Sequence, residues 1–289
     1  MMSAFRCLST ALVASLFLAG CSLNSPQTPS LTSLASQSEH EPVRRMLDIQ
    51  HWETSTGTAV FFAPSLELPM LDVRLTFAAG SSQDGEVYGL ASLTNALIDA
   101  GTQSSSADEI ALTFEQLGAL FSTSSHRDMA IIQLRTLSDP AYSLPALKML
   151  AEVLAEPAFP NAAIERLKNQ YMASFAQQKK NPGQLANLEL FQQLYGTHPY
   201  AHSSSGTEHS LPGISRHDLQ AFYTQFYTAK NVQIVLVGDL DRQRAEQIAE
   251  QLANALPKGQ SAPPVATPEV PAEKRHHIEF DSNQTHILL

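Results

Sequence analysis

The hydrophobic pattern of residues 46–256 constrains the fold most, because it changes between the two-residue period of strands and the longer period of helices. Residues 71–77, Leu-Asp-Val-Arg-Leu-Thr-Phe, alternate apolar and polar positions, as a half-buried strand does. Residues 86–100 instead carry apolar side chains at positions i, i+3, i+7 and i+8, namely Leu90, Leu93, Leu97 and Ile98. The two patterns together predict an α+β domain.

Capping and helix-breaking residues set the limits of the predicted elements. Ser106-Ala-Asp-Glu109 is typical of a capping box, which predicts a helix from Ser106 to Gly118. Pro157 and Pro160 separate two further helices. We expect strands at 47–52, 59–63, 71–77, 122–126, 129–137 and 231–237, and helices at 86–100, 106–118, 141–155, 161–179, 183–195, 216–227 and 242–255.

The first residues are typical of an export signal. An apolar run from Leu8 to Gly20 follows Arg6 and is too short to span a bilayer comfortably. It ends in Leu-Ala-Gly-Cys21, which resembles the lipobox of bacterial lipoproteins. This resemblance implies removal of residues 1–20, lipidation of Cys21 and a lipid anchor in the cell envelope. Because no retention aspartate follows Cys21, we expect the outer membrane, facing the periplasm. An ordinary secretory signal is the alternative.

Two segments of biased composition flank the predicted domain. Residues 21–45 are rich in Ser, Pro, Thr and Gln and predict a flexible tether. Residues 257–274 contain five prolines and predict an extended linker. After it, residues 276–280 and 285–289 have strand-like sequences. We therefore expect residues 275–289 to begin a second domain, with this chain as the first half of a longer protein.

Charge and cysteine content exclude several classes of function. The chain has 18 Lys and Arg against 28 Asp and Glu, a formal net charge of −10 without a basic cluster, so no nucleic-acid partner is expected. The two cysteines, Cys7 and Cys21, both precede the predicted domain, which excludes thiol catalysis in it. No nucleophile elbow, phosphate-binding loop or dinucleotide fingerprint occurs.

A series of short stretches from residue 46 to residue 289 resembles the pitrilysin/insulinase family of zinc peptidases, the inverzincins. The stretches, in family order, are Ala79-Gly-Ser81, residues 89–102, Leu117-Gly118, Glu156-Pro-Ala-Phe159, residues 194–200, Gly206-Thr207, residues 218–223, residues 235–239 and Asn283-Gln-Thr-His286. The resemblance implies a domain like those of pitrilysin and the mitochondrial processing peptidase, with a mixed β-sheet packed by helices, followed by the start of a second, similar domain.

The zinc signature of that family is degenerate in this chain. In His-x-x-Glu-His the two histidines bind Zn²⁺, the glutamate is the general base for the zinc-bound water, and a glutamate on a later helix is the third ligand. The matching stretch is Ser92-Leu-Thr-Asn95-Ala96, so Ser92 and Ala96 stand at the ligand positions and Asn95 at the base position. Residues 170–176, where the third ligand is expected, contain no acid. We expect no catalytic residue, metal ligand or cofactor, although enzyme activity stays open.

One interpretation of these positions is structural. Ser92, Asn95, Ala96 and Asp99 fall on the side of the predicted helix opposite its apolar stripe. On this interpretation they form a mildly polar surface lining a wet cleft.

A relocated metal site is the other interpretation. The candidate ligands are His198 with His202, or His276 with His277. Pro199 interrupts any helix through the first pair, and adjacent residues on a strand point to opposite faces. Neither pair has favourable geometry for one metal ion.

The resemblance implies a non-catalytic partner of an active zinc peptidase. Family members pair their halves around a peptide-sized chamber, and zinc-less halves occur beside active ones. The expected partners are a zinc-bearing homologue in a heterodimer, peptide substrates and the lipid anchor, with zinc only in the active partner. An Arg/Tyr pair of the family's second domain would fall beyond Leu289. The alternatives are a zinc metallopeptidase with unconventional ligands, or a periplasmic lipoprotein that binds or assembles peptides.

Overall fold

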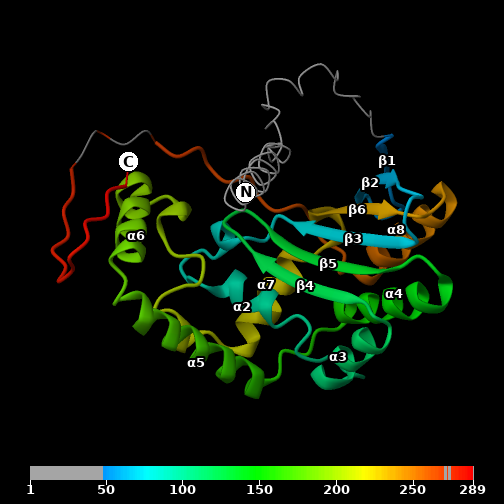
Figure 1. Cartoon of the computed structure of the whole chain (residues 1–289), viewed down its shortest axis with the longest axis horizontal. Helices are drawn as coiled ribbons and strands as arrows, with labels where there is room; N and C mark the ends of the chain where they lie inside the picture. Colours follow the sequence, from blue (N-terminus) through cyan, green and yellow to red (C-terminus); the bar gives the residue numbers. More distant parts are fainter. Residues whose placement is uncertain (1–47, 270–271, 273–274, 289) are drawn as a thin grey trace, which may run out of the picture. The chain divides into compact units, whose positions relative to one another are not determined.

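The computed structural model describes residues 48–269, 272 and 275–288. Its six strands form one mixed sheet in the order β1-β2-β6-β3-β5-β4 (Figure 1). Strands β2 and β6 are parallel, and all other neighbouring strands are antiparallel. The strands are β1 (Gln50–Glu53), β2 (Ala59–Pro64), β3 (Met70–Phe77), β4 (Leu120–Ser125), β5 (Ala130–Leu137) and β6 (Val232–Gly238). The predicted α+β fold with a mixed sheet is confirmed.

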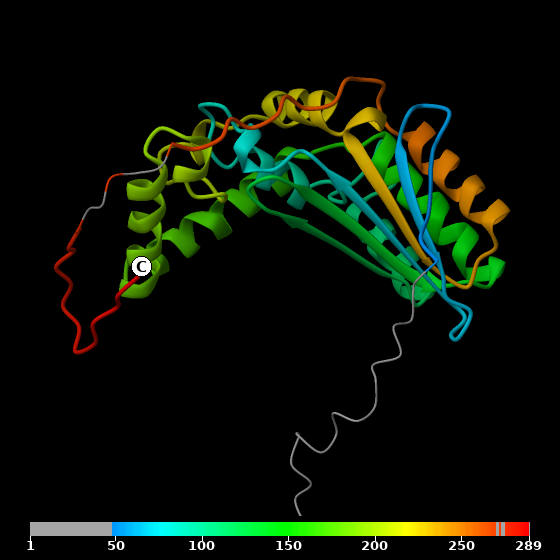
Figure 2. The same ribbon diagram turned by 90° about the horizontal axis from the view of Figure 1, so that it is seen from above.

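Helices α4 and α8 pack on one face of this sheet, as the views in Figures 1 and 2 show. The α-helices are α2 (Leu90–Ala96), α3 (Ala107–Gln116), α4 (Pro140–Ala155), α5 (Asn161–Gln178), α6 (Pro182–Tyr195), α7 (Arg216–Phe226) and α8 (Arg242–Ala255). Short 3-10 helices are η2 (Ser81–Gln83), η3 (Pro199–Ala201), η4 (Leu211–Gly213) and η5 (Ala229–Asn231). Residues of α2, α4, α7 and α8 share one apolar core with the buried residues of the sheet.

The alternation predicted for residues 71–77 determines which face of the sheet is buried. Leu71, Val73, Leu75 and Phe77 are at most 1% exposed and belong to the core beneath the helices. Asp72 and Arg74 therefore point to the opposite face, where β3 is half-buried or exposed. Strand β6 alternates in the same way. The sheet thus has one face packed on the core and one face open.

Capping interactions explain where two helices begin. The Ser106 hydroxyl accepts the N–H of Glu109, and the Glu109 carboxylate accepts the backbone N–H of Ser106, which is the predicted capping box. The backbone N–H and the hydroxyl of Ser106 both donate to this carboxylate and lower the pKa of Glu109. Ser215 and Asp218 form an equivalent box at the start of α7. Local sequence therefore determines both helix starts.

Helix α2 is shorter than predicted. The pattern predicts a helix over 86–100, whereas only Leu90–Ala96 is helical. Gly89 directly before it has φ +95°, a left-handed conformation that interrupts the helix. A Cβ there would lie 2.9 Å from the Ser205 carbonyl oxygen, so the position requires glycine. The apolar stripe is nevertheless buried as predicted: Leu90, Leu93, Leu97 and Ile98 are each at most 9% exposed.

The described part of the proline-rich segment predicted as a linker forms neither helix nor strand, and residues within it are hydrogen-bonded to the domain. We call residues 257–266 the strap. The Ala262 N–H donates to Asn231 Oδ1 at 2.7 Å, and the Thr228 hydroxyl donates to the Gln260 carbonyl at 3.1 Å. Further along, Gln83 Nε2 donates to the Pro263 carbonyl at 3.2 Å. The strap therefore donates one backbone N–H and accepts at two carbonyls, and these hydrogen bonds hold it on the domain.

The two strands predicted at 276–280 and 285–289 are wrong for the described part of this segment. Residues 275–288 form neither helix nor strand, and they are exposed. A strand requires a neighbouring strand to accept and donate its backbone hydrogen bonds. No strand of the described sheet pairs with residues 275–288. The assignment of residues 275–289 to a second domain stays a prediction.

The predicted signal peptide, Cys21 and the tether 21–45 lie outside the described residues. Within the described ranges, no helix has the length and apolar character needed to cross a membrane.

Candidate functional site

The carboxylate of Asp84 fixes the start of α2, the helix that carries the degenerate signature. Asp84 Oδ2 accepts the N–H of Gly89 at 2.8 Å, and Oδ1 accepts the N–H of Ala91 at 2.7 Å. A carboxylate is favoured there because the first N–H groups of a helix have no partner within the helix. Asp84 therefore positions the signature residues that follow.

A histidine supports this buried carboxylate. His202 Nε2 lies 3.4 Å from Asp84 Oδ2 and 3.1 Å from the Ser81 carbonyl oxygen, and its ring stacks on Tyr88 at 4.1 Å. Burial raises the pKa of Asp84, while the hydrogen bonds from His202, Ala91 and Gly89 act in the opposite direction. Asp84 therefore holds the start of α2, and the His202 ring is engaged by Asp84.

The first ligand position is occupied by a hydroxyl that is hydrogen-bonded to a tyrosine. Ser92 Oγ lies 3.0 Å from Tyr171 Oη on α5, and Ser92 is 8% exposed. Tyr171 belongs to the stretch 170–176, in which the third zinc ligand is expected. A neutral hydroxyl pair thus stands where the family places a histidine and a carboxylate.

The base position is occupied by a buried amide. Asn95 is 1% exposed, and its Oδ1 accepts a hydrogen bond from Tyr227 Oη at 3.1 Å. Burial raises the pKa of Tyr227 well above its ordinary value, so the phenol keeps its proton and is the donor. An amide oxygen that is already hydrogen-bonded cannot accept a proton from water.

Aromatic rings surround this hydrogen bond. The Tyr227 ring lies 4.7 Å from Phe77 and 5.3 Å from Tyr223, measured between centroids. The Tyr223 hydroxyl donates in turn to the Leu154 carbonyl. The interpretation of Ser92 and Asn95 as the lining of a wet cleft is therefore wrong, because both side chains are packed against α5 and α7. Only Ala96 and Asp99 are half-buried.

These residues do not fit a catalytic zinc ion. A catalytic site needs three protein ligands and an open water position. The helix offers the hydroxyl of Ser92 and the amide of Asn95, both engaged with tyrosines, and the methyl of Ala96 has no donor atom. In the described parts of the chain, no group of three His, Cys, Asp or Glu residues could hold a metal ion.

The histidines considered as relocated ligands take part in other interactions. His198 and His202 both line a 300 Å³ pocket next to Tyr88. The His198 ring bonds to the Ala266 carbonyl at 2.7 Å and accepts the Tyr200 N–H at 3.2 Å, so both of its nitrogens are used. His202 contacts Asp84, as described above.

The second histidine pair is separated as well. His276 pairs with Glu189 at 3.3 Å, whereas His277 pairs with Glu279 at 3.2 Å. The structure brings neither predicted pair together on one metal position.

The sequence analysis did not predict the two tyrosines, Tyr171 and Tyr227, that form hydrogen bonds with the degenerate signature residues. Tyr227 lies in an aromatic stretch with helical spacing, which indicates core and is correct for its ring. Its hydroxyl needs a buried partner, and that requirement could have indicated Asn95. Tyr171 lies in residues 170–176, where the third zinc ligand is expected and no acid occurs. A tyrosine at that place could have indicated a hydrogen bond to Ser92 in place of a metal ligand.

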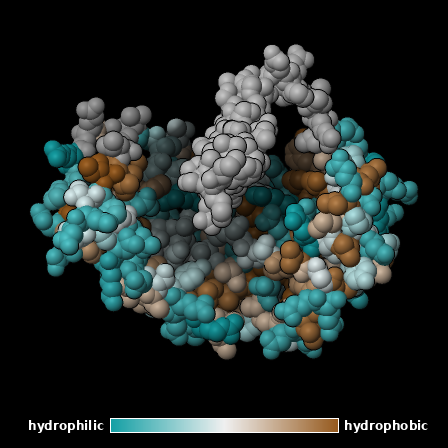
Figure 3. Space-filling view, in the orientation of Figure 1, coloured by the Kyte–Doolittle hydropathy of each residue, from teal (hydrophilic) through white to brown (hydrophobic). Residues whose placement is uncertain are grey.

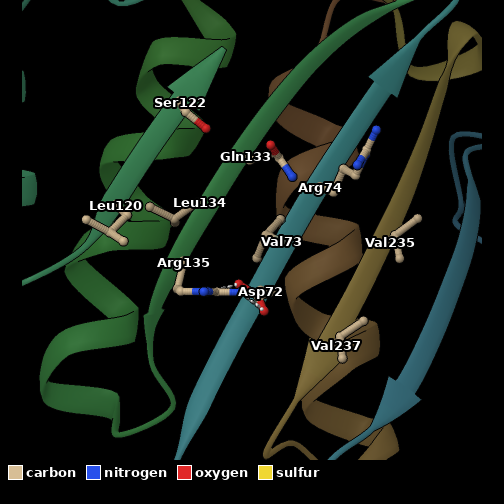
Figure 4. A pocket seen from close by; sticks show the side chains of 10 residues that line it. All are labelled: Asp72, Val73, Arg74, Leu120, Ser122, Gln133, Leu134, Arg135, Val235 and Val237. Atoms are coloured by element: carbon tan, nitrogen blue, oxygen red, sulfur yellow. Dashed lines mark hydrogen bonds and ion pairs between the residues drawn. The ribbon is translucent and has the colours of Figure 1, made fainter. Parts of the chain in front are cut away.

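A second candidate site lies on the open face of the sheet. A groove of 390 Å³ runs over β4, β5, β3 and β6, and Figure 4 shows the helices behind these strands. Asp72, Arg74 and Arg135 project on this open face, whereas Val73 and Leu134 belong to the buried core. Near its centre, the Arg135 guanidinium donates two hydrogen bonds to Asp72, at 2.6 and 2.9 Å.

Comparison with known proteins identifies the family. The family model "Insulinase (Peptidase family M16)" matches residues 69–208, and "Peptidase M16 inactive domain" matches residues 213–289. The chain is 30% identical to the "Non-peptidase homolog YmxG" of Helicobacter pylori over 65% of this chain and 43% of that protein. It is 23% identical to the "Mitochondrial-processing peptidase subunit beta" of Saccharomyces cerevisiae over 67% of this chain and 42% of that protein. The chain thus spans under half the length of these curated relatives.

Solved structures agree with this assignment. The crystal structure of a peptidase M16 inactive domain from Pseudomonas fluorescens is 49% identical, with a TM-score of 0.77, over 78% of this chain and 55% of that chain. Pitrilysin shares the fold at 21% identity, with a TM-score of 0.67, over 79% of this chain and 25% of that chain. The chain therefore belongs to the insulinase family, peptidase family M16, as a member without the zinc-binding residues of the family signature.

Proposed function

We propose that this chain is a catalytically inactive M16 protein that acts as the non-catalytic partner of an active, zinc-bearing homologue. In this role it contributes one wall of a peptide-binding chamber in the cell envelope. The observation that carries the proposal is the filled signature position, where Ser92 bonds to Tyr171 and buried Asn95 accepts from Tyr227. Loss of the ligands together with repacking of their surroundings is what a half retained for binding requires.

The family supports the pairing. Two relatives are named as the beta and alpha subunits of the mitochondrial processing peptidase, so members of this family function as subunits. Another relative is named a non-peptidase homolog. A silent subunit beside an active one is consistent with both kinds of relative.

The edge of the sheet provides the contact surface that this role needs. Strand β4 is the last strand of the sheet, so its outer backbone groups have no strand partner among the described residues. Helix α2 lies beside β4, which brings the former metal position and the free edge together. An extended peptide can add to such an edge through main-chain hydrogen bonds. The peptide would then pass the signature helix without being cleaved.

We also propose a lipid anchor at Cys21 for this protein. The anchor would hold the domain at a membrane of the cell envelope, with the outer membrane facing the periplasm as the expected location, and residues 21–45 would act as its tether. Metabolic labelling with a radioactive fatty acid should mark the wild-type protein and not Cys21→Ser. A labelled Cys21→Ser protein would contradict the anchor.

Reconstitution tests the partner role. The full chain in non-ionic detergent is mixed with a homologue from the same cell that retains His-x-x-Glu-His, and hydrolysis of a quenched fluorescent peptide is followed. The chain alone should show no chelator-sensitive hydrolysis, and the mixture should exceed the homologue alone. A homologue carrying Glu→Gln in its signature is the control, because its mixture should stay inactive. No change on mixing would remove the partner role.

The same preparation distinguishes the alternative of a peptide-binding lipoprotein. That function predicts peptide binding by the isolated chain with no effect on any homologue. A neighbouring gene that encodes the intact signature would favour the partner role, whereas an isolated gene would favour the alternative.

A further inference from the structure

The open face of the sheet has an ordered arrangement of charges. Strand register places Asp72 beside Val237 on one side and Arg135 on the other. Two residues further along β3, Arg74 stands between Val235 and Gln133. Side chains of one face recur every second residue, so these are two parallel rows across the groove. The rows are separated by about 6.6–6.8 Å along the strand.

The two arginines of these rows are not equivalent. Arg135 holds Asp72 through both Nε and Nη2, so this pair is mutually neutralised. Arg74 has no carboxylate partner in the described part of the chain, and its Nε donates only to Thr76 Oγ1 at 3.4 Å. Arg74 is therefore an uncompensated positive charge in the groove of a chain whose formal net charge is −10.

The surroundings of Arg74 are apolar on the β6 side. Val235 and Val237 line the groove, and Val237 is 37% exposed. Ser122 and Gln133 line the opposite side. Figure 4 shows Arg74 and the two valines projecting from neighbouring strands on the viewer's side of the sheet. Outside the grey atoms, the face drawn in Figure 3 has hydrophobic and hydrophilic residues intermixed.

We infer that this groove binds an extended peptide segment with an acidic side chain seated on Arg74 and an aliphatic side chain two residues away over Val237, in the neighbouring row. The periodicity is compatible, because side chains at i and i+2 of an extended peptide are separated by the same distance as the two rows. The inference rests on the proposed function, since it specifies which peptides the chamber wall selects. It gives a preference for acidic, aliphatic segments over basic ones.

A matched pair of peptides tests the inference. Both are short, fluorescein-labelled, acetylated and amidated, and they differ only in Glu or Gln two residues before a valine, so no terminal carboxylate contributes. Binding to the full chain in non-ionic detergent is measured by fluorescence anisotropy at low ionic strength. An exposed carboxylate–guanidinium contact predicts about two- to fivefold tighter binding of the Glu peptide. The difference should disappear in ~0.5 M NaCl, because salt screens exposed charges.

Two substitutions localise the effect. Arg74→Gln should bind both peptides equally, whereas Lys148→Gln, which makes the same charge change on the exposed surface of α4, should keep the preference for Glu. Arg135→Gln should weaken binding of the Glu peptide, since it leaves the Asp72 carboxylate uncompensated in the groove.

Three results would overturn the inference: equal binding of the two peptides by the wild type, a Glu preference that survives Arg74→Gln, or no binding of either peptide. If activation of the zinc-bearing homologue persists in any of these cases, the partner role stands and only the assignment of the groove fails. If activation is lost while the Glu preference persists, the partner role fails and the groove remains a peptide site.

Discussion

Removing the Tyr227 hydroxyl should measure how firmly the former base position has been built into the core. Tyr227 is fully buried and Asn95 is 1% exposed, so no water can replace the hydrogen bond between them at 3.1 Å. Tyr227→Phe leaves the Asn95 carbonyl buried without that donor, which costs about 1–3 kcal/mol of unfolding free energy. For a domain of this size each kcal/mol lowers Tm by about 2–4 °C.

The assay is urea unfolding of the full chain in detergent, followed by circular dichroism, for wild type, Tyr227→Phe, Asn95→Ala and the double variant. We expect each single variant to lose stability and the double variant to lose less than their sum, with an interaction energy of about 1–2 kcal/mol. Tyr171→Phe is the matched control, because its contact with Ser92 is only partly buried and should contribute less. Additive losses, or no loss in Tyr227→Phe, would mean that the hydrogen bond between Tyr227 and Asn95 does not stabilise the fold.

Three further predictions concern the histidine positions of α2, the carboxylate at its start, and a glycine at the end of β6. Introducing both family histidines by Ser92→His and Ala96→His should lower Tm, since Ser92 is 8% exposed and overpacking costs about 1–3 kcal/mol of unfolding free energy. The double variant should also show no chelator-sensitive peptide hydrolysis, and hydrolysis by this variant would contradict the prediction. The pKa of Asp84 is raised in the fold, so its contribution to stability should fall as pH rises above 3.8; the unfolding free energies of wild type and Asp84→Asn compared across pH check this, and a constant difference would contradict it. Gly238→Ala should lower the unfolding free energy by more than about 2 kcal/mol, because φ is +151° and a Cβ would lie 2.1 Å from the Met70 carbonyl oxygen. Gly213→Ala is the control: a Cβ there has nothing within 4 Å, so its unfolding free energy in the same urea assay should stay close to that of the wild type.

Much of the fold could be predicted because local signals and packing agree in it. The capping box at Ser106 and Glu109 satisfies helix N–H groups without help from distant residues, so the sequence alone indicated it correctly. The alternation along β3 identified both the buried face and the residues, Asp72 and Arg74, that point away from it. Such features depend on neighbours within a few positions in the chain.

Features that depend on distant partners were not predictable in the same way. The start of α2 is set by Gly89, which packs so closely against Ser205 and Gly206, far along the chain, that a side chain would not fit. The strap was predicted to be a linker from its prolines, but Asn231 and Gln83 bind it. Periodicity describes one segment at a time and carries no information on hydrogen bonds between segments.

The candidate site shows the same division. The absence of ligands at Ser92, Asn95 and Ala96 was evident from residue types alone, because none can bind zinc as histidine does. That Asn95 is buried against Tyr227 depends on α7 packing on α2, a contact between residues 132 positions apart. The residue types at the signature positions therefore predicted that zinc ligands are missing, and only the structure shows that tyrosines occupy the space beside them.

The zinc content and peptidase activity of the isolated chain decide whether helix α2 can take part in a catalytic zinc site. The full chain is purified in detergent without chelator, equilibrated with Zn²⁺ and desalted; its zinc is then measured by mass spectrometry, and its peptide hydrolysis is assayed with and without chelator. We expect well below one equivalent of zinc per chain and no chelator-sensitive hydrolysis, because Ser92, Asn95 and Ala96 provide no ligand set. One equivalent of tightly bound zinc, lost together with hydrolytic activity on chelation, would contradict it.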